Sequence, residues 1–202
     1  MNKINYQKKL DEIINNLNGE KPSLLIHSCC APCSSYVLEY LINYFKISVL
    51  YYNPNIFPKE EYYFRKSELS RFIFERYKDE IEEIDCDYEN DIFEEAVKGF
   101  ENEEEGKKRC EICFNLRLEK TAKIAKELNF DYFVTTLSIS PLKNAELLNS
   151  IGEKIGEKYQ IKYLPSDFKK REGYKRSIEL SSEYNLYRQN YCGCRFSHHT
   201  KN

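Results

Sequence analysis

Short apolar runs alternate along the chain with longer segments in which apolar residues recur at the 3.6-residue period of a helix. The short runs predict strands at residues 23–27, 47–52, 81–84, 132–136 and 161–164. The longer segments predict helices at residues 5–17, 36–45, 59–78, 91–98, 110–128, 144–159 and 174–184. Strands joined by helical crossovers run parallel. The pattern therefore predicts an α/β fold with a Rossmann-like parallel sheet and flanking helices.

The 202 residues suit a single α/β domain over 1–202, because no internal repeat and no long polar linker divides them. Residues 1–20 form its N-terminal helical segment, and residues 185–202 form a cysteine-bearing tail that we expect to fold back to the site. No apolar run approaches the roughly 20 residues of a membrane span. The first residues also lack the apolar core of a secretory signal. We therefore expect a cytoplasmic protein without a membrane partner.

Eight cysteines are the chemical feature that needs an explanation. Cytoplasmic thiols are kept reduced, so such a set predicts metal binding or redox chemistry rather than a disulfide framework. Seven of them fall into three clusters, which are Cys29, Cys30 and Cys33, then Cys110 and Cys113, and finally Cys192 and Cys194. Cys86 has no spaced partner, and we interpret it as a small half-buried residue near a strand end.

The first cluster, in HSCCAPCSS, follows the first predicted strand and opens the next helix. In open α/β sheets, ligands bind beyond the carboxyl ends of the strands. The N-terminus of a helix also supplies free N–H groups and partial positive charge, which stabilise thiolates. We therefore interpret this cluster as a site. The nearby Ser28, Ser34 and Ser35 are predicted to cap the helix, and His27 to be a packed residue.

The other two pairs can also chelate a metal. Cys110 and Cys113 stand three apart at a predicted helix start, so both thiols face the same side. Gly193, between the last two cysteines, allows a tight backbone turn around a ligand. Seven thiols exceed the four ligands of a tetrahedral zinc ion, so zinc explains at most part of the set. Four thiolates would hold a 4Fe-4S cluster, and three remain for a second metal or for redox chemistry.

Two alternative interpretations use fewer of these thiols. The sequence CAPC after a strand is also typical of a thiol-disulfide oxidoreductase that uses Cys30 and Cys33, although this leaves the other clustered cysteines without a role. A zinc-stabilised RNA-binding module without catalysis is the other alternative.

Charge is unevenly distributed along the chain. Residues 1–100 carry 12 Lys and Arg against 18 Asp and Glu, whereas residues 101–202 carry 19 against 15. Tyrosines are interleaved with the basic residues near the end of the chain, which include Lys169, Lys170, Arg171, Lys175, Arg176, Arg188 and Arg195. A basic face with aromatic residues suits a polyanion such as RNA, and a solvated helix face is the alternative.

Four segments of the chain together resemble one enzyme family. They are HSCCAPCSSYVLEYL, YYNPNIFPKEEY, KRCEICFNLRLEKTAKIAKELNFDYFVTTLSISPLKN and EGYKRSIELSSEYNLYRQNYCGCRFS. The double cysteine, the RC-x-x-C and the YRQ-x-YCGC elements, in this order, resemble the cobalamin-independent epoxyqueuosine reductase family of the QueH type. The resemblance covers about residues 22–197.

The resemblance implies a fold similar to the adenine-nucleotide alpha-hydrolase-like proteins. It also implies a tRNA-modifying reductase, which removes the epoxide oxygen of epoxyqueuosine at the anticodon wobble position to give queuosine. The implied cofactors are a 4Fe-4S cluster and a nearby mononuclear metal ion, iron, without cobalamin. The metal-site residues carried over by motif are Cys29, Cys30, Cys110, Cys113, Cys192 and Cys194. Relatives can carry Asp at the position of Cys33; either side chain can be a ligand, so the shell of the second metal stays open.

The implied partners are the anticodon stem-loop of a tRNA and an external electron donor, since the chain has no flavin or nicotinamide fingerprint. Converting an epoxide to an alkene and water takes two electrons and two protons. Asp167 is our hypothesis for the proton donor, with a helix cap as its alternative role. We expect Asn53, Arg176, Arg188 and Gln189 to bind the substrate, and the basic residues from Lys169 to Arg176 to grip phosphates.

Overall fold

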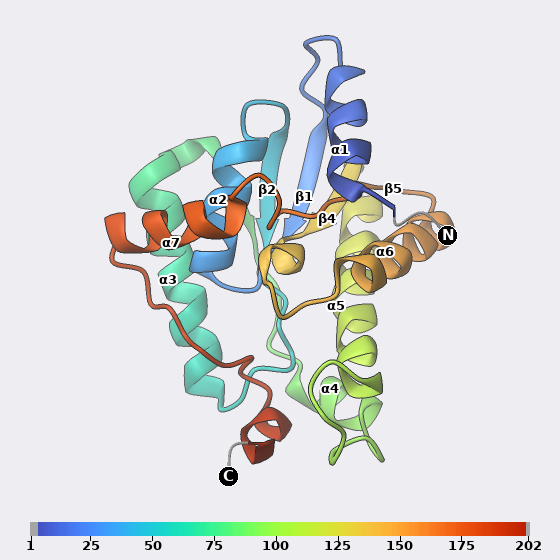
Figure 1. Ribbon diagram of the computed structural model, residues 1–202, viewed down its shortest axis with the longest axis vertical. Coiled ribbons are helices and arrows are strands. Elements are labelled where there is room, and N and C mark those ends of the chain that lie inside the picture. Colours follow the sequence, from blue (N-terminus) through green and yellow to red (C-terminus); the bar gives the residue numbers. More distant parts are fainter. Residues whose placement is uncertain (1–3, 201–202) are drawn as a thin grey trace.

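The computed structural model describes residues 4–200, with side chains described as far as residue 197. Its strands form one parallel sheet in the order β3-β2-β1-β4-β5 (Figure 1). The strands are β1 (Ser23–His27), β2 (Lys46–Leu50), β3 (Glu82–Ile84), β4 (Tyr132–Thr135) and β5 (Lys162–Tyr163). The α-helices are α1 (Tyr6–Asn15), α2 (Ala31–Leu41), α3 (Lys59–Tyr77), α4 (Asn90–Ala96), α5 (Lys108–Glu127), α6 (Ala145–Tyr159) and α7 (Gly173–Glu183). Short 3-10 helices are η1 (Lys78–Glu80), η2 (Thr136–Ile139) and η3 (Arg195–Thr200). The predicted α/β fold with a Rossmann-like parallel sheet is thus confirmed.

The central strand β1 explains why the sheet needs helices on both faces. Successive side chains of a strand point to opposite faces of the sheet. Leu24 and Ile26 join the apolar core that α1, α2 and α3 contribute to, whereas Leu25 joins the core of α5 and α6. All three side chains are fully buried. A strand with both faces covered reads as a continuous apolar run, which is why this strand could be predicted residue for residue.

Helix α2 begins five residues earlier than predicted and is the main correction to the element boundaries. Cys30 is its N-cap, with an extended backbone, and Pro32 lies in the first turn, where a missing N–H is harmless. The prediction that neighbouring serines cap this helix was wrong. The hydroxyl groups of Ser34 and Ser35 instead donate to the carbonyl oxygens of Cys30 and Pro32, at 2.8 and 2.9 Å. The hydroxyl of Ser28 is buried and has no partner among the described residues.

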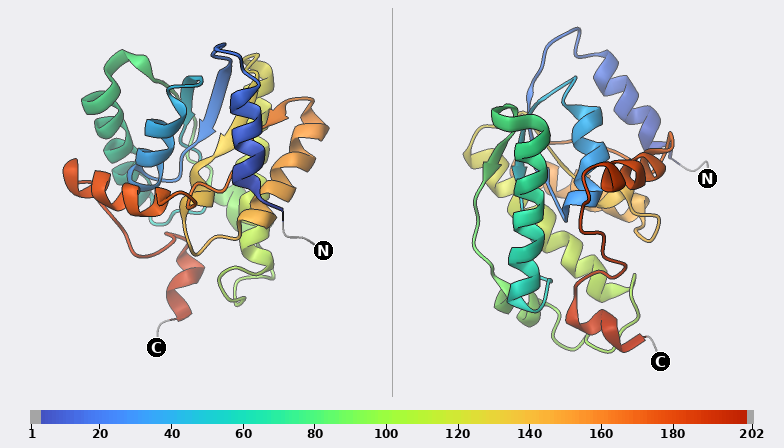
Figure 2. Two further views of the ribbon diagram at one scale, coloured as in Figure 1. Left: turned by 45° about the horizontal axis from the view of Figure 1, so that its top comes forward. Right: turned by 90° about the vertical axis from the view of Figure 1, so that its left-hand side faces the viewer.

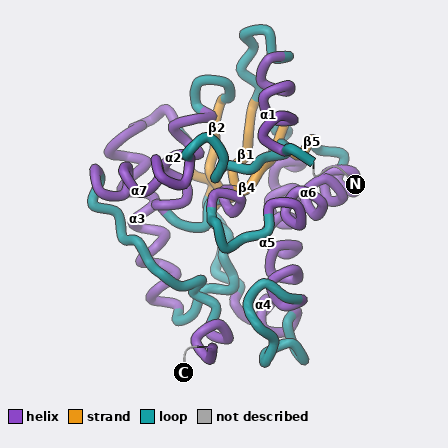
Figure 3. Tube along the Cα trace, viewed as in Figure 1, coloured by secondary structure: helices purple, strands orange, loops and turns teal. Residues whose placement is uncertain are grey.

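The loops after β1, β2 and β4 gather at the carboxyl edge of the sheet, below it in Figure 3. In the register of the sheet, His27 lies beside Leu50 on one side and Thr135 on the other, so these three strands end at one level. The C-terminal tail returns to this edge, where Cys194 forms an antiparallel bridge with Ile56. Four separate segments of the chain therefore meet at the carboxyl ends of the strands.

No helix within residues 4–200 combines the length and the apolar character needed to cross a membrane. The helix α7 lies against α2 (Figure 2). At this contact, a Cβ atom built on Gly173 would lie 2.0 Å from the carbonyl oxygen of Phe168 and 2.4 Å from the ring of Tyr36. Only glycine permits so close an approach at the start of α7.

Candidate metal centre

The sulfur atoms of Cys29, Cys30 and Cys33 lie within 4.8 Å of one another, so all three are within reach of one metal ion. We call these residues the first cysteine group. Cys30 is buried, whereas Cys29 and Cys33 are half-buried. The Sγ atoms of Cys29 and Cys30 are 3.9 Å apart, and the hydroxyl of Thr136 donates to Cys29 Sγ at 3.5 Å. The end of β1 and the first turn of α2 thus bring three thiols close together.

The electrostatics of the first cysteine group favour one thiolate among three sulfurs. Hydrogen bonds from the thiols of Cys30 and Cys33 hold the pKa of Cys29 well below its usual range. The same contact with Cys29 raises the pKa of Cys30 to about 12, and that of Cys33 is also raised. A bound metal cation would take the place of the remaining protons, because thiols ligate metals as thiolates.

Four more thiols form the second cysteine group, which consists of Cys110, Cys113, Cys192 and Cys194. Cys113 and Cys194 are buried and pack with Cys192 against Phe93. Electrostatic interactions link Cys113 to the other three sulfurs. Burial raises the pKa of Cys113 to about 12 and that of Cys194 to about 11. Without a cation Cys113 and Cys194 stay protonated, so the group has four sulfur donors, two of them buried, but needs positive charge before these two ionise.

Arg117 lies between the two cysteine groups. It follows Cys113 by one helical turn of α5, and its side chain is 3% exposed. One guanidinium nitrogen, Nη1, is 3.8 Å from Cys113 Sγ, and Nη2 donates to the side-chain oxygen of Asn53. Cys29 and Cys192 also interact with this cation electrostatically. Arg117 is therefore a buried positive charge that both groups share.

Asn53, a predicted substrate-binding residue, is fully buried and supports Arg117. Its side-chain nitrogen donates to the carbonyl oxygen of Ser28 at 2.9 Å, while its oxygen accepts from Arg117. The amide thus ties the loop after β2 to the loop after β1. In this structure Asn53 orients a cation beside the cysteines and does not line the cavity described next.

A cavity of about 510 Å³ opens beside the first cysteine group. Its walls are formed by that group, by Arg65 and Arg117, by residues 140–143, by the start of α7, and by residues 188–192 of the tail. Cys192, a member of the second cysteine group, is among the lining residues. A shallower cavity of about 380 Å³ lies against β5 and has no cysteine in its lining. The first cavity is therefore the place where a substrate can approach both sets of thiols.

Two of the predicted substrate-binding residues, Arg188 and Gln189, line this cavity. Gln189, in the amide orientation that satisfies both neighbours, accepts from Arg65 Nη1 at 3.1 Å and donates to the carbonyl oxygen of Tyr187 at 3.1 Å. Arg188 donates to the hydroxyl of Ser181 at 3.4 Å and lies over the ring of Tyr174. The C-terminal tail, as it returns to the carboxyl edge of the sheet, thus places both residues in the wall of the cavity.

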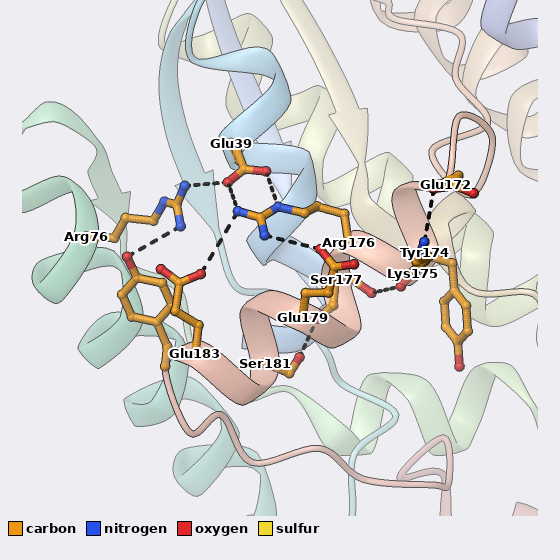
Figure 4. A network of polar contacts seen from close by, with 11 residues as sticks. Glu39, Arg76, Glu172, Tyr174, Lys175, Arg176, Ser177, Glu179, Ser181 and Glu183 are labelled. Atoms are coloured by element: carbon orange, nitrogen blue, oxygen red, sulfur yellow. Dashed lines mark hydrogen bonds and ion pairs between the residues drawn. The ribbon is translucent and has the colours of Figure 1, made fainter.

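Arg176 and Asp167, also predicted as site residues, do not line the cavity. The guanidinium of Arg176 makes two hydrogen bonds of 2.9 Å to Glu39 of α2 (Figure 4). Asp167 pairs with Lys169, with 2.7 Å between Oδ1 and Nζ, in the segment before α7 rather than at a helix cap. Other basic residues of this region also form ion pairs with carboxylates. These pairs are Arg171 with Asp11, Lys175 with Glu172, and Arg195 with Glu94. Much of the basic stretch is thus neutralised within the protein.

The Glu39–Arg176 pair should make a pH-dependent contribution to stability. Hydrogen bonds from Arg176 hold the pKa of Glu39 below its usual range. A carboxylate with a lowered folded-state pKa stabilises the fold above its unfolded pKa, and this stabilisation is lost as the pH falls through the folded-state pKa. Because Arg176 is partly exposed, solvent screens the pair. We expect Glu39→Gln to lower the free energy of unfolding by about 1 kcal/mol at pH 7.

Urea unfolding of wild type and Glu39→Gln, at about pH 7 and about pH 3, measures this contribution. The difference between the two proteins should shrink at the lower pH, because Glu39 takes up a proton in the folded state as the pH falls toward its lowered pKa. The control is Glu179→Gln, which removes the more exposed partner of Arg176 and should have the smaller effect. An equal difference at both pH values would contradict the role of this ion pair.

Two further cations near the cysteines were not predicted. Lys143 lines the cavity, with its Nζ 2.8 Å from Glu105 and 3.9 Å from Cys192 Sγ. Burial lowers the pKa of Lys143, but the interactions with Cys192 and Glu105 outweigh burial and raise that pKa above the usual range. Arg109 is 2% exposed and donates to the carbonyl oxygens of the loop before α5. The four-residue spacing on one helix could have predicted that Arg117 lies beside Cys113. No pattern in the sequence predicts that Lys143 lies beside Cys192.

His27 and Cys86 lie as expected, outside the two cysteine groups. His27 is fully buried, with Nε2 2.9 Å from the carbonyl oxygen of Tyr52 and Nδ1 2.8 Å from the hydroxyl of Thr135. Burial lowers the pKa of His27 to about 3, so the ring is neutral and both nitrogens are engaged. Cys86 is half-buried just after β3 and donates to the carbonyl oxygen of Tyr51.

Comparison with known proteins gives one consistent family. Residues 24–200 match the family described as "Epoxyqueuosine reductase QueH". A Staphylococcus epidermidis protein of that description is 46% identical, over 96% of this chain and 85% of its own length. One from Streptococcus pyogenes serotype M1 is 45% identical over 95% of this chain and 77% of its own, and one from Thermotoga maritima is 38% identical over 87% and 90%. The chain therefore belongs to the epoxyqueuosine reductase QueH family.

Proposed function

We propose that this chain is an oxidoreductase of tRNA modification. In this proposal it removes the epoxide oxygen of epoxyqueuosine at the anticodon wobble position, giving queuosine. The observation that carries the proposal is that four of the seven clustered thiols and the shared buried Arg117 line one open cavity, in a chain of this family. The other three thiols interact electrostatically with Cys192, which lines that cavity. The reaction consumes two electrons and two protons and releases the oxygen as water. A site that combines metal ligands with room for a nucleoside fits these requirements.

The second cysteine group fits a 4Fe-4S cluster better than a single ion. A tetrahedral zinc ion with Zn–S bonds of about 2.3 Å needs four sulfurs only about 3.8 Å apart. Among the described residues, the first cysteine group alone brings three or more such ligands within 4.8 Å of one another. A four-iron cluster accepts a wider spacing, since each thiolate binds a different iron atom. Cys110, Cys113 and Cys194, whose pKa values are raised by burial, also need a strongly cationic partner before they ionise.

In the same proposal, the first cysteine group holds the second, mononuclear metal, which we take to be iron. When bound, the cluster would supply electrons singly, and the mononuclear metal would act as a Lewis acid toward the epoxide oxygen. Both adjacent cysteines, Cys29 and Cys30, are assigned to the mononuclear metal, and each of the seven cysteines then serves only one of the two centres. Cys192 lines the same cavity as the first group, which is consistent with electron transfer over a short distance.

The protein side chains then bind the substrate and control its surroundings. Arg188 and Gln189 are placed to contact the nucleotide that enters the cavity. Arg117 and Lys143 keep positive charge beside sulfur atoms that carry negative charge when ionised. The protons come from water that enters the cavity or from an acid; Asp167 remains our hypothesis for this acid, although its carboxylate pairs with Lys169. The tRNA anticodon stem-loop and an external electron donor are the partners, in the cytoplasm.

Anaerobic purification followed by iron, sulfide and zinc analysis tests the cofactor proposal, together with absorption and EPR spectra. We expect iron and acid-labile sulfide. Incubation with epoxyqueuosine-containing tRNA and a strong reductant, followed by mass spectrometry of the nucleosides, tests the reaction; we expect conversion to queuosine. A colourless zinc protein would support the RNA-binding module instead. Metal-independent activity that requires only Cys30 and Cys33 would support a thiol-disulfide oxidoreductase.

A further inference from the structure

The opening of the cavity has two walls of different chemistry. One wall is the loop at residues 140–143, on which Leu142 is 78% exposed. The other wall is the start of α7 and the returning tail, with Tyr174 36% exposed and Arg188 beside it. Residues that both line a cavity and remain exposed lie at its mouth. Leu142 and Tyr174 therefore lie where an incoming substrate first meets the cavity.

The Tyr174 wall is held in place by contacts on the opposite side of α7. Figure 4 shows Arg176 turned toward Glu39 of α2, while Tyr174 points away from this network. Gly173 fixes the start of the helix by its close approach to Tyr36. Arg188 covers the Tyr174 ring with its guanidinium 5.3 Å from the ring centre. The ring is therefore oriented before any ligand arrives.

The Leu142 wall is also ordered by specific contacts. The hydroxyl of Ser140 accepts from the backbone N–H of Leu142 at 3.3 Å, and the next residue, Lys143, pairs with Glu105. A single exposed leucine is common on protein surfaces. Here it belongs to a fixed turn at the mouth of the cavity that Cys29, Cys30, Cys33 and Cys192 line. It presents an apolar side chain at the mouth of the cavity that Tyr174 also lines.

We propose that this mouth is a stacking clamp for the unpaired RNA bases next to the reacting nucleotide. Tyr174, backed by Arg188, would stack on one neighbouring base, and Leu142 would pack against another. Sequence-specific proteins commonly read RNA loops by stacking splayed bases on aromatic rings and guanidinium planes. Such a clamp lets the modified base pass inward to the thiols while its neighbours stay outside. This inference rests on the proposed function, because it assumes an RNA loop as the substrate.

The side-chain chemistry gives the clamp a testable signature. Stacking depends on the ring and not on the phenol hydroxyl, so Tyr174→Phe should bind RNA as tightly as wild type. Compared with wild type, Tyr174→Ala should bind the RNA at least about 10-fold more weakly, and Leu142→Ala should bind it several-fold more weakly. The control is Phe74→Ala on α3, which removes a 71% exposed aromatic residue that does not line the cavity. Thermal unfolding of each variant verifies that the fold is intact.

The experiment measures binding of an anticodon stem-loop RNA with guanosine at the wobble position to the metal-loaded protein, by fluorescence anisotropy. A second RNA lacks the two bases that flank the wobble position. Wild type should bind the second RNA more weakly, and Tyr174→Ala, which keeps only the Leu142 contact, should distinguish the two RNAs less than wild type does. Binding that is equal for all variants would overturn the clamp and leave the proposed reaction standing. No binding by wild type would count against both the clamp and the tRNA substrate.

Discussion

Replacing any one residue of the second cysteine group by alanine is expected to abolish the iron-sulfur absorption of the protein. Each of these four thiols is a proposed ligand of a different iron atom, so the loss of one opens the cluster to solvent and oxidation. Reductase activity should fall by at least about 100-fold, since changes that only support metal ligands already cost 10–100-fold.

Substitution in the first cysteine group should separate the two centres. Cys30→Ala removes a buried ligand of the proposed mononuclear site but none of the proposed cluster. We expect this variant to keep its iron-sulfur spectrum, to bind one metal ion fewer, and to lose activity by a similar factor. Absorption spectra, metal analysis and nucleoside mass spectrometry of the same preparation give the three readings.

Cys86→Ala is the matched control, because it removes a half-buried thiol that belongs to neither group. It should retain the spectrum, the metal content and the activity, with a loss of stability of about 1 kcal/mol. If Cys30→Ala lost the iron-sulfur spectrum while Cys113→Ala kept it, the assignment of the groups would be reversed. Unchanged spectra in all these variants would contradict a cysteine-bound cluster at this site.

The fold was accessible from the sequence because its strongest signals are local. The strand at residues 23–27 is buried on both faces and therefore reads as an apolar run. Helix α5 begins two residues before its predicted start, and its cysteines lie in the first turn as expected. The range predicted for α2 began five residues too late, although the first cysteine cluster was expected to open this helix, because the sequence CAPC has no apolar periodicity. Its helical turn is set by a proline and by the cap at Cys30 instead.

The candidate site was only partly predictable, for a physical reason that its charged residues illustrate. Spacing groups cysteines that are close in sequence, but only the fold brings the tail beside α5. Charge patterning suggested Arg176 as a substrate contact, yet in three dimensions Glu39 of α2 neutralises it. Conversely, Lys143 stands in an ordinary loop sequence and becomes notable only because Cys192 and Glu105 lie next to it. Ion pairs between segments that are distant in sequence therefore decide which charged side chains remain available to bind a substrate.

Arg117→Met is expected to make the reduction potential of the cluster more negative while leaving its thiol ligands in place. Reduction adds negative charge to the cluster, and a nearby buried cation favours the reduced state. Arg117 supplies this cation, with Nη1 3.8 Å from Cys113 Sγ. A loss of interaction worth a factor of ten shifts a one-electron potential by about 59 mV, so a shift on the order of 60 mV is expected. Turnover with a weak reductant should fall about tenfold, and less with a strong one.

Potentiometric titration followed by EPR measures this shift directly and does not depend on turnover. Arg117→Lys keeps the charge but loses the planar fork that bonds Asn53, so its potential should lie between those of Arg117→Met and wild type. Arg71→Met is the control, because that arginine pairs with Glu68 and Glu75 on the outer side of α3. An unchanged potential in an Arg117→Met protein that retains its full iron-sulfur spectrum would show that the shared cation does not tune the cluster. A shift that Arg117→Lys restores would show that the charge itself is the cause, because the two variants remove the same hydrogen bond to Asn53.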